Sequence, residues 1–452
     1  MVDQETLLKD LQKQVQFLED DLRERGQDPT AIKGAGPNGE PESFDAYLKR
    51  EYQKARDAER VGIAEGEWRE GQITQAAVAW VLSTVFVRFC EDNGLLEQPF
   101  ITGPKDERDR YGIAQELKEA WVLQGRSEDP AAPELTDRDW LEHAFEQMSV
   151  SSVMAGLFDK QHNPMWTITP SHQAAKQLID FWRQVGEDGH LVHDFTDPDW
   201  NTRFLGDLYQ DLSEATRKKY ALLQTPEFVE EFILDYTLEP AIEEFGLDGD
   251  RIYQEDSQGF RLIDPTCGSG HFLLGAFHRL LDKWREAEPG ASDWDLINRS
   301  LRSVHGVDKN PYAVAIARFR LLIAAMKEGG ITTLSESSPE WPIVVATGDS
   351  LLHGRGAPGE QRTLFGGGTH YYSTEDVRDY VSEHDLLGVN SYHTVVGNPP
   401  YITVKDKQEN QNYRQAYSQV CSGKYALSVP FAQRFFDLAK LGSGFEQRAG
   451  YT

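Results

Sequence analysis

The chain has 452 residues, of which 39% are hydrophobic, and this length is typical of two or three domains with their own cores. Its 74 acidic residues outnumber 46 basic ones, and the net charge of −28 makes the average surface repel polyanions such as nucleic acids. The three cysteines, Cys90, Cys267 and Cys421, lie far apart, which indicates neither a disulfide framework nor a zinc site and favours a reducing cytoplasm.

An amphipathic helix is predicted near the start, because leucine and valine recur there at spacings of three and four residues. The pattern comprises Leu7, Leu11, Val15, Leu18 and Leu22. This helix either pairs as a short coiled coil or packs on its own chain. Residues 34–41 predict a flexible linker, so we expect an N-terminal segment over residues 1–60. The acidic start shows no secretion signal.

A helical domain is expected over residues 61–204. Its centre is the apolar stretch Ala76–Cys90, which is interrupted by Arg88 and is too short to span a bilayer, so we expect a buried helix and no membrane contact. Thr74 is expected to cap this helix at its start and Gly94 at its end. Four tryptophans are predicted to be core residues rather than platforms for bases: Trp140, Trp166, Trp182 and Trp200.

Strand–turn–helix units begin at about Leu205. Four short apolar runs each lead to a polar or glycine-rich turn, and they lie at residues 261–263, 304–307, 343–346 and 394–397. Strands that alternate with helices predict an α/β fold with a Rossmann-like, doubly wound parallel sheet over residues 205–452. Because crossover connections are right-handed, the turns after these strands meet at one edge of the sheet.

Two further segments of this region carry expectations. Thr225-Pro226 is predicted to open a helix, with Thr225 as the N-cap. Its expected apolar face comprises Phe228, Phe232, Ile233 and Tyr236. Residues 353–390 are expected to form a mobile loop, since the spacing of His353, His370 and His384 fits no metal site.

The predicted sheet edge is acidic. The turn Asp264-Pro265-Thr266-Cys267-Gly268-Ser269-Gly270 follows the first strand, and its glycines let the backbone approach a ligand closely. Asp308 ends the second strand, where a carboxylate typically binds ribose hydroxyls, and Asp349 ends the third, where it could accept a hydrogen bond from an adenine amine. This lining suits a cationic adenosine such as S-adenosylmethionine. NAD is the second candidate cofactor, although its pyrophosphate would meet Asp264.

A stiff polar loop follows the fourth strand. In Asn398-Pro399-Pro400-Tyr401, two prolines fix the backbone beside an amide, a carbonyl and an aromatic ring. Hydrogen-bond acceptors beside a flat ring suit a planar amine as the substrate. A proline-stiffened surface turn is the alternative interpretation of the tetrapeptide taken alone.

In this order, the motifs resemble those of the amino-methyltransferases that modify adenine N6 in DNA. The resemblance covers the chain from about Leu205 onward and includes Leu222-Leu223-Gln224-Thr225-Pro226, which is similar to the family's leading cofactor motif. It implies S-adenosylmethionine as the cofactor, bound by Thr225, Pro226, Asp264, Pro265, Thr266, Cys267, Gly268, Gly270, Phe272, Asp308, Lys309, Asp349 and Ser350. It implies that catalysis is carried by Asn398, Pro399, Pro400 and Tyr401, without a metal.

The resemblance also implies a mechanism. Asn398 Oδ1 and the Pro399 carbonyl would accept the two N–H bonds of the target amine and direct its lone pair toward the methyl donor. Tyr401 would stack on an adenine flipped out of double-stranded DNA, because the target atom is unreachable inside a duplex. Positioning and electrostatics would then carry the transfer.

The N-terminal half resembles a narrower group. Val87-Arg88-Phe89-Cys90-Glu91-Asp92-Asn93-Gly94, joined to such a core, is similar to the large methyltransferases of bacteriophage-exclusion systems of the phage growth limitation type. This resemblance implies host marking in a bacterial phage-defence system, with other defence proteins as possible partners.

Two features depart from the family pattern. A helix at residues 428–441 and the start of a strand at residues 449–452 should be followed by further strands and a DNA-target domain, so we expect an N-terminal portion of a larger protein with an incomplete sheet. The cations after the polar loop are few, and we interpret them as a solvated face: Lys405, Lys407, Arg414 and Lys424. The main DNA contacts are expected from the missing portion or from a partner.

Three alternatives stay open. A protein-glutamine N5-methyltransferase faces the same chemical problem at an amide nitrogen, although the helical region and the 353–390 insertion argue against it. A chain with an incomplete sheet could bind cofactor or a partner without catalysis. A cytosine-N4 enzyme is the third alternative, and Asn rather than Ser at position 398 favours adenine.

Overall fold

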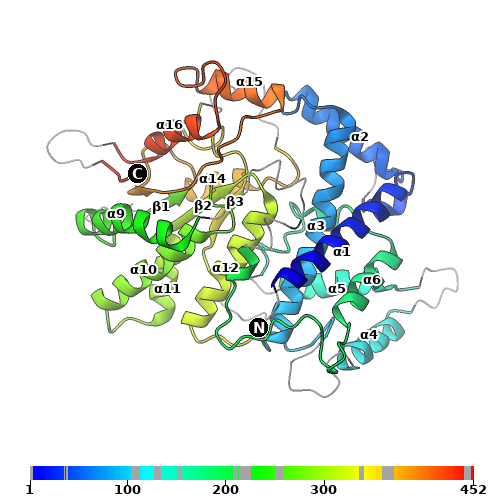
Figure 1. The fold of residues 1–452 in the computed structure, drawn as a ribbon. Coiled ribbons are helices and arrows are strands. Elements are labelled where there is room, and N and C mark those ends of the chain that lie inside the picture. Colours follow the sequence, from blue (N-terminus) through cyan, green and yellow to red (C-terminus); the bar gives the residue numbers. More distant parts are fainter. Residues whose placement is uncertain are drawn as a thin grey trace.

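A helical region is followed by a sheet region in the computed structural model of the chain (Figure 1). The structure describes residues 4–34, 36, 39–102, 112–126, 134–150, 154–206, 212, 225–249, 259–334, 341–358, 371–441 and 449–452. The helical region contains α1 (Gln4–Glu24), η1 (Pro29–Ala31), α2 (Phe44–Asp57), α3 (Glu65–Asp92), α4 (Gly112–Gln124), α5 (Asp137–Val150), η2 (Pro164–Trp166) and α6 (His172–Trp182). The sheet region contains α9 (Glu227–Phe245), β1 (Leu262–Asp264), α10 (His271–Ala287), α11 (Asp293–Arg302), β2 (Val304–Asp308), α12 (Pro311–Glu328), β3 (Val344–Thr347), α14 (Val377–His384), β4 (Thr394–Val395), α15 (Lys407–Ala416) and α16 (Ser428–Leu438).

The long helix α3 is the axis of the helical region. The apolar stripe of α1 is buried against it, so the predicted amphipathic helix packs on its own chain. By length and composition α3 could cross a membrane, but its apolar window is entirely buried inside the protein, as in the core helix of a globular domain. The predicted buried helix is therefore confirmed.

The start of α3 differs from the prediction, whereas its end agrees. Thr74 does not cap the helix, since α3 begins at Glu65, and the Thr74 hydroxyl instead donates to Glu19 Oε1 of α1 at 2.5 Å. Gly94 does end the helix, with φ of 68°, and the amide of the next residue, Leu95, donates to the Cys90 carbonyl at 2.8 Å. Among the predicted core tryptophans, Trp140 and Trp182 are fully buried.

Charged side chains near the end of α3 are buried and internally paired. Arg88 donates to Asp92 Oδ2 at 2.7 Å and to the carbonyls of Trp182 and His193. Glu91 accepts the backbone N–H groups of residues 100–102 at 2.5–2.8 Å and the Thr102 hydroxyl at 3.0 Å. The motif at residues 87–94 therefore ties α3 to two loops of the helical region.

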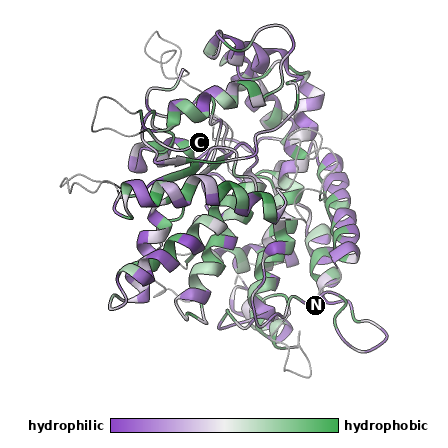
Figure 2. Cartoon of the chain, turned by 60° about the vertical axis from the view of Figure 1, so that its left-hand side comes forward, coloured by the Kyte–Doolittle hydropathy of each residue, from purple (hydrophilic) through white to green (hydrophobic). Residues whose placement is uncertain are grey.

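Four parallel strands form one sheet in the order β3-β2-β1-β4, so the four predicted strands are confirmed. Leu262 lies beside Val304 of β2 and Thr394 of β4, and the direction of strand addition reverses at β1. Helices α10 and α12 contact one side of the sheet, while α14 and α16 belong with a separate apolar cluster on the other side. Along β1, Leu262 joins the first cluster and Ile263 the second, which is the alternation expected of a strand buried on both faces. Figure 2 shows the green, hydrophobic strands enclosed between helices that turn purple faces outward.

Several details of the sheet region differ from the predictions. The expected apolar face of α9 is wrong for three of its four residues: Phe228, Phe232 and Tyr236 are 72%, 58% and 67% exposed, because Leu234 and Leu238 point to the core instead. The fourth residue, Ile233, does pack against the core. The expected loop at residues 353–390 contains the helix α14, which packs on β3, while residues 359–370, including His370, lie outside the described residues. The sequence patterns also missed α11 and α15.

The helical and sheet regions share one apolar core. Phe86 of α3 stacks on Phe319 of α12 with ring centroids 4.7 Å apart. Arg318 of α12 donates to the Gly156 carbonyl of the helical region at 2.9 Å. A single cluster of buried residues runs from α1 through α3 into α10 and α12.

Candidate active site

The turn after β1 is tied to the end of β2. The Gly268 amide donates to Asp308 Oδ2 at 3.0 Å, and the Asn310 amide donates to Asp308 Oδ1 at 2.8 Å. Gly268 and Gly270 have φ of 52° and 82°, and a Cβ on Gly270 would approach Ala317 Cβ to 3.0 Å. Glycine is therefore required at position 270, where a left-handed backbone lies directly on α12.

The polar loop after β4 lies against the same turn. The Val396 amide donates to the Ile263 carbonyl at 3.0 Å, which continues the pairing of the two strands. A Cβ on Gly397 would come within 2.7 Å of Asp264 Oδ1 and of Thr266 Oγ1, so only glycine allows this approach. Asn398, the next residue, therefore lies beside the β1 turn.

Thr225 contacts the loop amide rather than capping its own helix. The N-cap of α9 is Pro226, and no side chain caps the helix. Asn398 Nδ2 donates to Thr225 Oγ1 at 3.3 Å, which leaves Asn398 Oδ1 as a hydrogen-bond acceptor. The predicted N-cap role is wrong, but the structure does bring Thr225 to the predicted catalytic loop. The residues at 222–224 lie outside the described part of the chain.

A partly buried polar network joins the ends of β2 and β3 to α15. Lys309 Nζ lies 3.2 Å from Asp349 Oδ2 and 2.9 Å from the Tyr413 hydroxyl, and it also pairs with Glu409. The Tyr413 hydroxyl donates to Asp349 Oδ2 at 2.7 Å. Neither Glu409 nor Tyr413 was predicted as a site residue, because in the sequence only their spacing of one helical turn connects them. Ser350 Oγ donates to the Pro265 carbonyl at 2.6 Å, which links this network to the β1 turn.

The three carboxylates at this edge of the sheet, Asp264, Asp308 and Asp349, differ in how their surroundings shift their pKa values. Burial raises the pKa of Asp264 to about 7, although hydrogen bonds from Thr266 oppose this rise. Burial also raises the pKa of Asp308, against the backbone N–H groups that it accepts. Burial would raise the pKa of Asp349 too, but the charge of Lys309 outweighs it and the pKa is lowered. Among the described residues, neither Asp264 nor Asp308 forms an ion pair, so a cationic ligand could supply a partner to either carboxylate.

The remaining predicted site residues divide into buried and exposed groups. Phe272 and Cys267 are 2% and 5% exposed and pack in the core, where burial raises the pKa of the Cys267 thiol. Tyr401 is 67% exposed, and Pro399 and Pro400 are half-buried. The loop therefore presents an aromatic ring to solvent beside a buried acidic turn.

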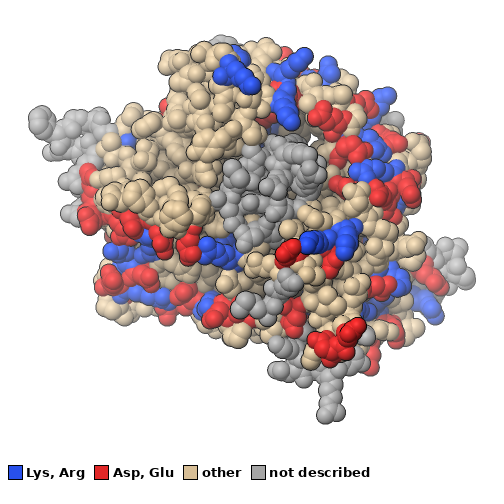
Figure 3. Space-filling view, viewed as in Figure 1, with Lys and Arg blue, Asp and Glu red and all other residues tan. Residues whose placement is uncertain are grey.

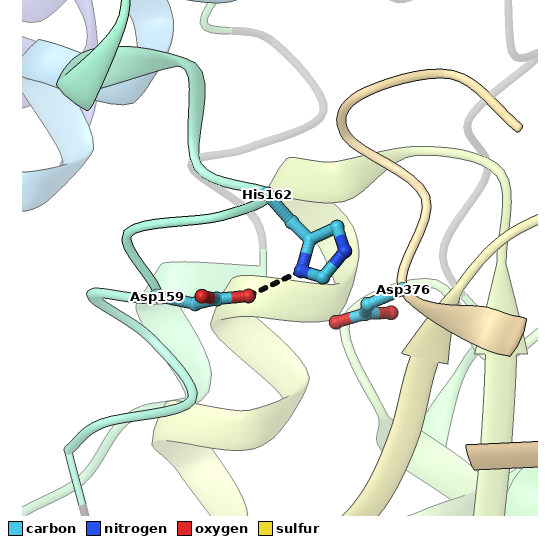
Figure 4. Close-up of side chains that lie close together, drawn as sticks. All are labelled: Asp159, His162 and Asp376. Atoms are coloured by element: carbon cyan, nitrogen blue, oxygen red, sulfur yellow. Dashed lines mark hydrogen bonds and ion pairs between the residues drawn. The ribbon is translucent and has the colours of Figure 1, made fainter. Parts of the chain in front are cut away.

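A second cluster of titratable groups lies between the two regions. Figure 4 shows the His162 ring between the carboxylates of Asp159 and Asp376, and their ligand atoms lie within 4.8 Å of one another. His162 Nδ1 is 2.5 Å from Asp159 Oδ2, but Asp376 Oδ2 already accepts from Arg318 at 2.5 Å. The Arg318 guanidinium thus occupies the position that a metal cation would take. We therefore interpret this cluster as a link between residues 154–164 and the sheet region rather than as a metal site.

Comparison with known proteins agrees with the motifs. The family model described as Eco57I restriction-modification methylase matches residues 302–445. The chain is 48% identical over 98% of its length to the adenine-specific methyltransferase PglX of Streptomyces coelicolor, of which it covers 35%. It is 26% identical over 41% of its length to the type II methyltransferase M.PaeR7I of Pseudomonas aeruginosa, of which it covers 25%. The chain thus spans between a quarter and about a third of the length of these relatives, and the resemblance that the sequence motifs indicated is confirmed.

Solved structures show a weaker likeness. The type IIL restriction-modification enzyme MmeI in complex with DNA has a TM-score of 0.44 and 13% identity over 80% of this chain and 45% of its own. The DrdV–DNA complex has a TM-score of 0.41 and 14% identity over 95% of this chain and 35% of its own.

Proposed function

We propose that this chain is the cofactor-binding and catalytic portion of a methyltransferase that modifies the N6 amine of adenine in DNA. The observation that carries the proposal is the approach of Gly397 to Asp264 and Thr266, because it brings the Asn398 amide and the glycine-rich turn to one edge of the sheet. The 48% identity to PglX over 98% of the chain supports adenine rather than glutamine or cytosine as the target.

S-adenosylmethionine fits the chemistry of this edge. The β1 turn carries two glycines with positive φ, and the half-buried carboxylate of Asp308 and the buried carboxylate of Asp349 lie at the ends of the next two strands. Asp264 is 1% exposed and has no ionic partner among the described residues, so a positive ligand charge would offset its burial. When bound, the cofactor supplies an electrophilic methyl group on a positively charged sulfur. NAD would instead bring negative charge to Asp264.

The chain's own residues would orient the target amine. Asn398 Oδ1 and the Pro399 carbonyl accept its N–H groups, and Thr225 holds the Asn398 amide by accepting from Nδ2. The exposed Tyr401 ring is available to stack on a flipped adenine. Fixed acceptors of this kind stabilise the charge that develops on the amine without needing to reorganise.

The proposal extends to organisation and partners. We infer that residues 205–452 form a Rossmann-like, doubly wound methyltransferase core, with helical segments at residues 1–60 and 61–204. Double-stranded DNA is the proposed substrate, with its main contacts outside these 452 residues, since the chain covers 35% of PglX. Host marking in a cytoplasmic phage-defence system is the proposed role.

A transfer assay tests the proposal. The chain is given S-adenosylmethionine with a labelled methyl group and is offered duplex DNA or protein extract. Label recovered as N6-methyladenine after digestion of the DNA supports the proposal. Label in glutamine of the extract, or in cytosine, contradicts it, and cofactor binding without any transfer would leave the chain a binding module.

A further inference from the structure

The stretch of chain that follows the polar loop folds back on itself. We call residues 402–427 the post-loop segment. Its ends are joined by a hydrogen bond from the Leu427 amide to the Ile402 carbonyl at 2.8 Å. Its buried side chains Tyr413, Tyr417 and Tyr425 pack with Leu351, which follows β3, in one apolar cluster. The segment therefore holds its surface side chains on a fixed framework that contains α15.

Both acidic side chains of the post-loop segment turn inward. Asp406 accepts from the amides of Gly62 and Ile63 in the helical region, at 2.8 and 3.3 Å. Glu409 pairs with Lys309, and its Oε1 lies 2.9 Å from the Tyr413 hydroxyl. Glu409 is thus paired with a cation, while Asp406 is turned toward backbone amides of the helical region.

All four cations of the segment are exposed: Lys405, Lys407, Arg414 and Lys424. The three lysines form no ion pair within the described part of the chain, although the whole chain has a net charge of −28. Arg414 lies over the Tyr425 ring at 5.3 Å and donates to the Gly423 carbonyl, which holds the loop that carries Lys424 against α15. Figure 3 shows Lys and Arg side chains gathered along the top of the molecule, where α15 lies.

We infer that the post-loop segment is a phosphate-contacting surface that holds the DNA backbone beside the flipped adenine. The inference rests on the proposed function and names the surface that the substrate touches. Exposed lysines without carboxylate partners gain from phosphate contacts, because each contact releases a condensed counterion. The surface begins four residues after Tyr401, the ring proposed to stack on the extruded base. The structure thus revises the interpretation of these four cations as a merely solvated face.

The test compares two triple variants that lose the same charge. Lys405→Gln/Lys407→Gln/Lys424→Gln removes the proposed contacts, and Lys13→Gln/Lys160→Gln/Lys176→Gln removes exposed lysines of the helical region. Binding of a labelled duplex is measured over a range of salt concentrations, and S-adenosylmethionine binding is measured in parallel. In the first variant alone, we expect the slope of log affinity against log salt concentration to become less steep by up to about 2.7, at about 0.9 per lost contact. Its KM for DNA should rise while cofactor affinity stays unchanged.

Two outcomes would overturn the inference. One is equal salt dependence and equal KM in the two triple variants. The other is a KM for DNA that stays at the wild-type value in the first triple variant. Methylation by the wild type with no difference between the variants would reject this surface and leave the proposed function standing. Binding through this surface without any transfer would reject the function and leave the surface standing.

A further variant separates orientation from charge. Asp406→Ala removes a negative charge, so charge alone predicts tighter DNA binding. If the contact of Asp406 with residues 62–63 orients the segment, DNA binding weakens instead. Tighter binding by this variant would contradict the idea of a preformed surface, and weaker binding with unchanged cofactor affinity would support it.

Discussion

Buried carboxylates in the two regions differ in how completely the protein satisfies them. Glu91 of α3 is 2% exposed and accepts three backbone N–H groups and a hydroxyl. Asp264 of the β1 turn is 1% exposed, yet among the described residues its carboxylate accepts hydrogen bonds only from Thr266. Burial alone therefore does not mark a functional site. A buried carboxylate that the fold leaves short of hydrogen-bond and ionic partners does mark such a site, because a ligand can supply the missing partner.

Breaking the buried network around Glu91 and Asp92 should lower the free energy of unfolding and leave the reaction unchanged. Arg88→Met leaves Asp92 and Glu91 as buried charges without their cation, and such a loss typically costs about 3–5 kcal/mol. We expect a large fall in the denaturant midpoint in urea unfolding, with methyl transfer per folded molecule unchanged. A loss of transfer in the folded fraction would show that the helical region takes a direct part in the reaction.

The opposite behaviour is expected at the polar loop. Asn398→Ala removes one acceptor of the target amine, and losing one such preorganised group typically lowers kcat by about 10²–10³-fold. Calorimetry should still detect cofactor binding, and the urea midpoint should stay close to that of the wild type. Retained transfer with lost cofactor binding would reverse the roles assigned to the loop and the turn.

Asp264, the buried carboxylate with few partners, should make cofactor binding depend on pH. The pKa of Asp264 is raised to about 7, so the group is mostly protonated at pH 6 and mostly ionised at pH 8. A cationic ligand prefers the ionised form, and affinity for S-adenosylmethionine should therefore rise about tenfold as pH rises through this range. S-adenosylhomocysteine, which lacks the positive sulfur, and the Asp264→Asn variant should both show a smaller change.

The smallest expected effect concerns the orientation of the loop amide. Thr225→Val removes the acceptor for Asn398 Nδ2, and one such hydrogen bond is worth about 1 kcal/mol, or about fivefold in kcat. Thr225→Ser restores the hydroxyl and should restore kcat. An equal loss in both variants would indicate that the Thr225 methyl group matters rather than its hydroxyl.

Local patterns in the sequence were sufficient to predict the strands and the turns between them. The four apolar runs become β1 to β4, and Asn310 caps α12 by accepting from the Tyr312 amide, because these features depend on neighbours in the chain. The order of motifs along the chain also predicted that the Asp264 turn and the loop at Asn398 share one edge.

Contacts between distant segments could not be predicted in this way. The partner of Asn398 is Thr225, and two partners of Lys309, Glu409 and Tyr413, lie on α15, which no periodic pattern revealed. The aromatic stripe at Phe228 and Phe232 has helical spacing but faces solvent, since periodicity identifies a stripe and not what covers it. Thr74 has the chemistry of a cap, but its hydroxyl pairs with a helix far away in the sequence.

The stacking of Phe86 on Phe319 limits how such enzymes can be recombined. Both rings are hidden, and they are contributed by opposite halves of the chain. A chimera that joins the first half of one relative to the second half of another, with its crossover between residues 206 and 225, would pair rings that never evolved together. Segments of this protein that are to be exchanged with a relative therefore have to be chosen so that side chains that pack together stay together, and not by their position along the chain.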